Sequence, residues 1–92
     1  MRVGIAGYGV VGKTRHLSIE ANTSFQVTAI SEKNTKAREA ISSDVKIYGD
    51  YKDLIADADI DVIFISLPNQ FAAEASSLSL QKGLHVFCEK PP

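Results

Sequence analysis

The sequence predicts an α/β fold, in which a parallel sheet of about five strands lies between helices to give three layers. Short apolar runs recur five times along the 92 residues, and most are separated by stretches of helical character. Strands that alternate with helices are joined by crossovers, which place them in parallel. Hydrophobic residues make up 45% of the chain and charged residues 23%, as in ordinary globular domains.

The five predicted strands differ in how completely they are apolar. Val62 to Ile65 is apolar throughout, which is typical of a central parallel strand covered on both faces. Val45 to Tyr48 is short and alternating, which suits an outer strand. The remaining predicted strands are residues 3–6, 25–30 and 84–88.

Four segments are predicted to form helices: residues 11–22, 35–42, a short stretch after Asp50, and the stretch after Asn69. Asp50 and Asn69 are candidate N-caps, and Gly83 is a candidate stop for the last helix. That helix carries Phe71, Ala75 and Leu78 at i, i+4 and i+7, so they share one face.

Charge and cysteine content exclude several classes of protein. The net charge is −1 without a basic block, so neither nucleic acid nor an anionic membrane is an expected partner. Cys88 is the only cysteine, so no internal disulfide can form, and we expect a cytoplasmic protein. The first apolar run is too short for a signal peptide or a membrane span. No metal site is predicted.

A glycine-rich loop follows the first predicted strand. Gly7, Gly9 and Gly12 form G-x-G-x-x-G and open a predicted helix, which is the context in which this motif binds a dinucleotide. There Gly7 permits a tight turn, Gly9 lets a pyrophosphate approach the backbone, and Gly12 lets helix and strand pack closely. The alternative is a strand-to-helix turn that binds nothing.

Glu32 follows the second predicted strand, about 20 residues after the glycines, where this fold places an acidic residue. Its carboxylate can accept hydrogen bonds from the adenosine ribose and repel a 2′-phosphate, so NAD is favoured over NADP. Lys33 and Lys36 are close enough in sequence to partner a phosphate, which keeps NADP possible. The alternative is a solvated loop acid.

Three segments in order, "GIAGYGVVGK", "DIDVIFISLPN" and "GLHVFCEKP", resemble the N-terminal Rossmann domain of the Gfo/Idh/MocA family. This family contains the glucose-fructose oxidoreductase and inositol dehydrogenase-like enzymes. The resemblance covers the whole chain. It implies an NAD-dependent oxidoreductase that transfers hydride between a hydroxyl of a sugar, cyclitol or related molecule and nicotinamide.

The resemblance also implies roles for single residues. Glu32 would bind the adenosine ribose, Glu89 the nicotinamide-side ribose, and Lys90 would be the active-site lysine next to the cofactor. A lysine there can relay the hydroxyl proton or stabilise the developing oxygen charge. Without the resemblance, Lys90 would be interpreted as a surface lysine. The other implied cofactor contacts are the loop residues Gly7, Tyr8, Gly9, Val10, Val11 and Gly12, and, toward nicotinamide, Ser66, Leu67, Pro68 and Asn69.

The chain departs from the family pattern in three respects. Ala72 stands where many members have a histidine, and the sequence ends at Pro92. Members also usually take a further catalytic acid or base, often His with Asp, from a second domain, and the only histidines here are His16 and His85. We therefore expect residues 1–92 to be an incomplete cofactor-binding domain that lacks the substrate domain and is inactive alone. His16 and His85 are interpreted as structural. Tyr8 is expected to pack the loop rather than do chemistry, and Cys88 is expected to be a small buried residue.

Alternatives to the enzyme remain. The family also includes non-catalytic NAD(P)-binding sensors, and other reductases, such as amino-acid-pathway or biliverdin-type enzymes, share the glycine loop. A remnant without a function of its own is a further alternative for the chain alone. The intact "EKP" at Glu89 to Pro91 favours the enzyme. Because the fifth strand is expected to have a free edge, we also predict self-association, and a homo-oligomeric parent protein.

Overall fold

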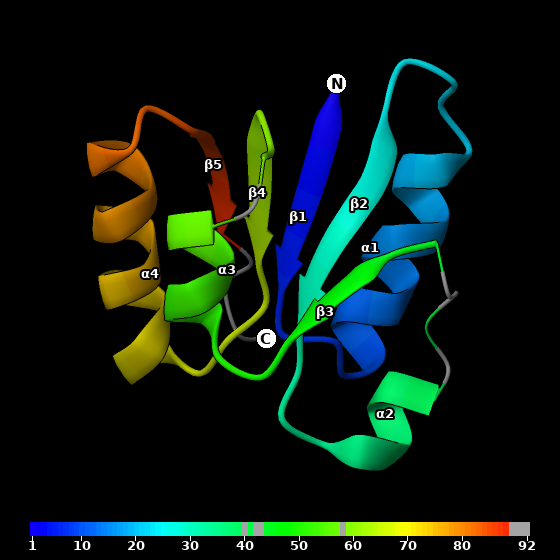
Figure 1. Cartoon of the computed structure of the whole chain (residues 1–92), viewed down its shortest axis with the longest axis horizontal. Coiled ribbons are helices and arrows are strands. Elements are labelled where there is room, and N and C mark those ends of the chain that lie inside the picture. Colours follow the sequence, from blue (N-terminus) through cyan, green and yellow to red (C-terminus); the bar gives the residue numbers. More distant parts are fainter. Residues whose placement is uncertain (40, 42–43, 58, 89–92) are drawn as a thin grey trace.

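The structure is a computed structural model that describes residues 1–39, 41, 44–57 and 59–88. It contains five strands and four helices in the described part, in strictly alternating order (Figure 1). They are β1 (Arg2–Ala6), α1 (Val10–Glu20), β2 (Gln26–Ser31), α2 (Thr35–Glu39), β3 (Lys46–Tyr48), α3 (Tyr51–Asp57), β4 (Val62–Ile65), α4 (Asn69–Gln81) and β5 (His85–Cys88).

The strands form one sheet in the order β3-β2-β1-β4-β5, and every neighbouring pair is parallel. The chain therefore builds outward from β1 to β3 and then returns to the other side of β1 for β4. The loops that follow β1 and β4 consequently leave the sheet toward opposite faces, and a crevice opens between them at the carboxyl ends of the strands. This arrangement confirms the predicted α/β fold.

Helices cover both faces of the sheet, so the predicted three layers are confirmed (Figure 1). One core cluster lies under α3 and α4 and includes Leu54, Ile63 and Ile65, which are fully buried. The other lies on the α1 face and includes Ile5 and Ile30. Because β1 and β4 contribute to both clusters, the continuous apolar runs of the sequence are explained by burial on two sides.

The predicted helix ends are partly confirmed. Asp50 caps α3, since its Oδ1 accepts the backbone N–H of Lys52 at 2.8 Å. Gly83, which ends α4, has a φ of +86°, a conformation that suits glycine. The predicted cap of α4 is wrong: Asn69 is the first helical residue, and Pro68 is the N-cap without a side-chain bond. Proline suits this position because its fixed φ matches the observed −55°.

The buried face of α4 also differs from the simplest expectation. Ala72, Ala75 and Ser79 are its buried residues, whereas Phe71 is 42% exposed. Small side chains let α4 lie close to β4 and β5, and Phe71 is directed toward the crevice instead. Ala72 is thus part of the packing of this helix.

Strand β5 is an edge strand of the described sheet, as expected. Its Phe87 is 55% exposed and stacks on Phe64 of β4, with ring centroids 4.9 Å apart. Cys88 is exposed, so the expectation that it is buried is wrong. It lies at the end of an edge strand of the described sheet, opposite Ile65 of β4.

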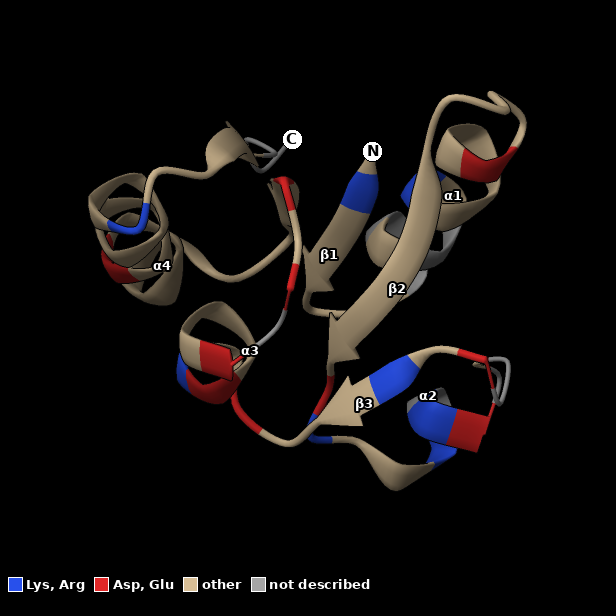
Figure 2. Cartoon of the chain, turned by 45° about the horizontal axis from the view of Figure 1, so that its top comes forward, with Lys and Arg blue, Asp and Glu red and all other residues tan. Residues whose placement is uncertain are grey.

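Charges are mixed over the surface. Figure 2 shows acidic and basic residues together on α2 and on α3. Within the described residues, no helix has the length and apolar character needed to cross a membrane.

Candidate dinucleotide-binding site

The glycine loop joins β1 to α1, and two of its glycines are required by the fold. Gly7 has a φ of +89°, and a Cβ atom on it would lie 2.6 Å from the carbonyl oxygen of Ser66. A Cβ on Gly12 would lie 2.4 Å from the carbonyl oxygen of Gly7. The first glycine therefore permits the turn and its approach to β4, and the second permits α1 to start close to that turn.

Gly9 is different, because the described protein gives no reason for a glycine there. Its φ of −77° and ψ of −159° are accessible to any residue, and an added Cβ would meet no described atom within 4 Å. Gly9 is also the N-cap of α1, where no described side chain caps the helix and no acidic residue lies in the first turn. The loop thus leaves open space beside uncapped backbone N–H groups, which is suited to an anion.

Glu32 follows β2 and its carboxylate is held by backbone groups. Oε1 accepts the N–H of Tyr8 at 2.7 Å, and Oε2 accepts the N–H of Asn34 at 2.9 Å. Each carboxylate oxygen can accept more than one hydrogen bond, so both keep capacity for a ligand hydroxyl. The interpretation of Glu32 as a merely solvated loop acid is therefore replaced by a fixed carboxylate beside the glycine loop.

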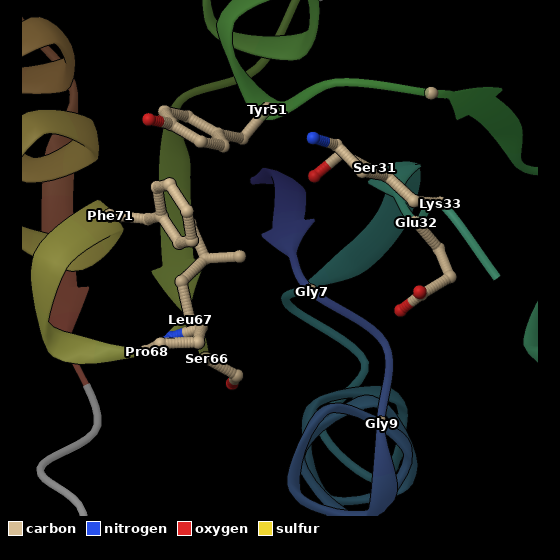
Figure 3. A pocket seen from close by; sticks show the side chains of 11 residues that line it. Gly7, Gly9, Ser31, Glu32, Lys33, Tyr51, Ser66, Leu67, Pro68 and Phe71 are labelled. Carbon is tan, nitrogen blue, oxygen red and sulfur yellow. The ribbon is translucent and has the colours of Figure 1, made fainter.

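These groups line one open pocket of about 260 Å³. Figure 3 shows the side chains of Tyr51, Leu67 and Phe71 on one side of it and Glu32 on the other, with the glycine loop between them. The pocket thus joins an apolar wall, a fixed carboxylate and a loop that can receive an anion. The full lining is Gly7, Gly9, Ser31, Glu32, Lys33, Gly49, Tyr51, Ser66, Leu67, Pro68 and Phe71.

Tyr51 and Phe71 were not identified from the sequence. Tyr51 begins α3, its ring is 6.3 Å from that of Phe71, and its hydroxyl donates to Glu74. This hydrogen bond, together with burial, raises the pKa of Tyr51 to about 12. The phenol thus stays protonated at neutral pH and its ring is fixed. Both residues lie just after a strand end, at the edge of the sheet where parallel-sheet ligands bind.

The predicted segment after β4 is only partly in the pocket. Ser66, Leu67 and Pro68 line it, whereas Asn69 does not and instead begins α4. The buried Oγ of Ser66 has no hydrogen-bond partner among the described residues. It is therefore a polar atom at the pocket wall that a ligand or solvent could satisfy.

The other predicted residues lie beside the pocket or outside the description. Tyr8 is only 5% exposed and packs on the α1 side, as expected for a residue that fixes the loop, so its backbone alone reaches Glu32. Val10 and Val11 form the first turn of α1. Glu89 and Lys90, predicted to contact the cofactor and to act in catalysis, lie outside the described residues.

Comparison with known proteins also indicates a dinucleotide-binding fold. Residues 1–92 match the profile of an oxidoreductase family with an NAD-binding Rossmann fold. The inositol 2-dehydrogenase of Salmonella typhimurium is 34% identical over 97 aligned residues, which cover 99% of this chain and 29% of that protein. The chain thus spans less than a third of the length of the curated relatives first matched.

Two solved structures are also similar. The scyllo-inositol dehydrogenase of Lactobacillus casei, with bound NAD(H) and scyllo-inositol, has a TM-score of 0.86 at 29% identity, over 99% of this chain and 28% of that one. The biliverdin reductase of Synechocystis, in complex with biliverdin and NADP⁺, has a TM-score of 0.86 at 28% identity, over 98% of this chain and 29% of that one. As its three sequence motifs indicated, the chain belongs to the Gfo/Idh/MocA oxidoreductase family, and residues 1–92 carry the NAD-binding Rossmann fold of that family.

Proposed function

We propose that this chain binds NAD in the pocket between the glycine loop and β4, as the cofactor-binding part of an oxidoreductase that acts on a sugar or cyclitol hydroxyl. The observation that carries the proposal is Gly9, a glycine without a role in the described fold, placed at an uncapped helix N-terminus beside Glu32. A pyrophosphate is the anion that such a position accepts in dinucleotide-binding folds.

The parts of the pocket match the parts of the cofactor. The apolar wall of Tyr51, Leu67 and Phe71 suits the flat adenine ring, and the carboxylate of Glu32 suits the two hydroxyls of its ribose. Two backbone N–H groups hold this carboxylate, so it cannot easily move aside for a 2′-phosphate. We therefore infer a preference for NAD over NADP, although the ammonium group of Lys33, which also lines the pocket, could pair with a 2′-phosphate.

The catalytic step is proposed from the family pattern. When bound, NAD would supply the acceptor for the hydride that leaves the carbon bearing the hydroxyl. Lys90 would take part in removing the hydroxyl proton, and Glu89 would contact the nicotinamide-side ribose. We further propose that residues 1–92 are one cofactor-binding domain. The relatives are longer than this chain, and we propose that a separate part of the whole protein, corresponding to that additional length, binds the substrate.

The substrate class rests on the inositol dehydrogenases among the relatives, since the same fold also serves a biliverdin reductase. A whole protein that forms homo-oligomers agrees with the exposed apolar edge at β5. The single cysteine agrees with a cytoplasmic location.

Calorimetric titration with NADH and NADPH tests the proposal. The purified chain should bind NADH more tightly than NADPH. Glu32→Gln, which removes the charge but keeps an acceptor for the Tyr8 N–H, should weaken NADH binding and narrow this difference. Glu39→Gln removes a carboxylate from the exposed end of α2 and serves as the matched control. Absence of NADH binding by a folded chain would refute the cofactor assignment.

A second measurement addresses catalysis. The 92-residue chain should show no dehydrogenase turnover with myo-inositol or other polyols, because the substrate is proposed to bind to a separate part of the whole protein. Turnover by the isolated chain would refute the proposal that substrate binding requires a separate domain.

A further inference from the structure

Tyr8, at the first variable position of the glycine loop, has a second set of contacts that the cofactor assignment does not use. Its hydroxyl lies 2.7 Å from Nδ1 of His16, and Nε2 of His16 lies 2.8 Å from Oε1 of Glu20. The Tyr8 and His16 rings also meet edge to face, with centroids 5.6 Å apart. One side chain of the loop is thus tied to two successive turns of α1.

The direction of these hydrogen bonds follows from their chemistry. The carboxylate of Glu20 can only accept, so Nε2 of His16 carries a proton and donates to it. In the neutral ring Nδ1 is then an acceptor, and it accepts a hydrogen bond from the Tyr8 hydroxyl. Burial and the nearby Glu20 carboxylate raise the pKa of Tyr8, so its phenol is protonated at neutral pH and can donate. Donors and acceptors therefore match along the whole chain of contacts.

This chain of contacts is largely shielded from water. Tyr8 is 5% exposed and the His16 side chain 12% exposed, while Glu20 reaches solvent at the end of α1. Hydrogen bonds away from water tolerate little displacement, because a buried polar group that loses its partner is costly. The ring of Tyr8 consequently has one favourable position relative to α1.

The backbone of the same residue is tied in the opposite direction. The N–H of Tyr8 donates to Oε1 of Glu32, at the end of β2. The loop is thus fixed between α1 and β2, immediately before the open position at Gly9. We propose that Tyr8, held by His16 and Glu20, is a positioning residue that orients the N–H groups of the glycine loop for the pyrophosphate of NAD. This inference rests on the proposed function.

A purely structural role for Tyr8 would have a different consequence. Loss of a purely structural Tyr8 contact would lower the stability of the domain and weaken the binding of all ligands of the pocket to the same extent. A positioning role should affect ligands that carry a pyrophosphate more than adenosine, which makes no contact through phosphate and meets a Glu32 carboxylate that the Asn34 N–H still holds. ADP and adenosine are therefore the two probes that separate the roles.

The test uses Tyr8→Phe, which keeps the ring and removes the hydroxyl, and His16→Phe, which keeps a ring at position 16 and removes both of its nitrogen atoms. His85→Ala, at an exposed position of β5, is the matched control. Loss of one hydrogen bond should weaken ADP and NADH binding by roughly three- to twentyfold, with adenosine binding changed less than twofold. In the free protein, NMR should show faster hydrogen exchange of the residue 8 amide in both variants and not in the control.

The outcomes are distinct. ADP binding as tight as that of the wild type in both variants, with unaltered exchange of the residue 8 amide, would overturn the inference while leaving the proposed function intact. Equal weakening of ADP and adenosine would also overturn it, in favour of a structural role. A wild-type chain that binds neither NADH nor ADP would overturn the proposed function, and the positioning role with it.

Discussion

Single alanine substitutions in the glycine loop should separate what the fold needs from what the cofactor needs. Gly9→Ala adds a methyl group where no described atom lies within 4 Å, whereas Gly12→Ala places one 2.4 Å from the carbonyl oxygen of Gly7. The first substitution should thus leave the fold intact and block the pyrophosphate. The second should disturb the fold itself.

The magnitudes follow from these contacts. At Gly9, alanine reduces the freedom of the unfolded chain, which stabilises by about 0.4–1 kcal/mol, but it is a poorer N-cap by a similar amount, so the net change should stay below about 1 kcal/mol. At Gly12, helix propensity favours alanine by about 1 kcal/mol, while crowding against a backbone atom costs about 1–3 kcal/mol. Because a carbonyl oxygen within a tight turn cannot move away, crowding should prevail and Gly12→Ala should destabilise.

Urea denaturation followed by circular dichroism measures the stability of each variant, and calorimetry with NADH measures its affinity. Gly9→Ala should unfold like the wild type and bind NADH at least about tenfold more weakly, a loss of about 1.4 kcal/mol. NADH affinity equal to that of the wild type would refute the claim that the free space at Gly9 admits the pyrophosphate. An unchanged stability of Gly12→Ala would refute the packing argument separately.

Three further predictions concern the fold. Leu54→Ala removes a fully buried side chain and should lower the free energy of unfolding by about 2–5 kcal/mol in urea denaturation, whereas the exposed Leu17→Ala should have little effect. Phe87→Glu should reduce self-association in sedimentation velocity, because it places a charge on the exposed edge at β5; a wild-type chain that is monomeric at high concentration would contradict this. Hydrogen bonds and ion pairs lower the pKa of the carboxyl groups of Asp57, Asp61 and Glu74. The stability that these groups contribute is present above their unfolded pKa values and is lost as the pH falls through their folded pKa values. Urea denaturation at pH 7 and at pH 3 should show a lower free energy of unfolding at pH 3, and replacing all three residues by Asn or Gln should make this difference smaller.

Much of the fold could be predicted because burial in a parallel sheet leaves a strong pattern. The run from Val62 to Ile65 corresponds to β4 residue for residue, and the short alternating run at Val45 to Tyr48 contains the edge strand β3. Helix ends were less certain. The N-cap of α4 is Pro68 rather than Asn69, a difference of one residue, and both residue types are compatible with a helix start.

The polar half of the site could be predicted, whereas its apolar wall could not. Gly7, Gly9 and Glu32 have a spacing that reflects the chemistry of a dinucleotide, and the structure brings all three to one pocket. Tyr51 and Phe71 have no such spacing, because their positions depend on how α3 packs against α4. From sequence alone, an aromatic residue on an amphipathic helix is most simply interpreted as part of the core.

Phe71 and Phe87 show that exposed aromatic residues in one small domain can have different explanations. Both belong to apolar patterns that the sequence assigns to buried faces, and both are about half exposed. Phe71 lies against Tyr51 and Leu67 at the wall of a pocket that also holds a fixed carboxylate, so polar and apolar groups converge around it. Phe87 stacks on Phe64 at a sheet edge, and the described residues that line the hollow beside these two rings include no carboxylate. The first exposure therefore indicates a small-molecule site and the second an uncovered packing surface, and only the first should respond to NADH.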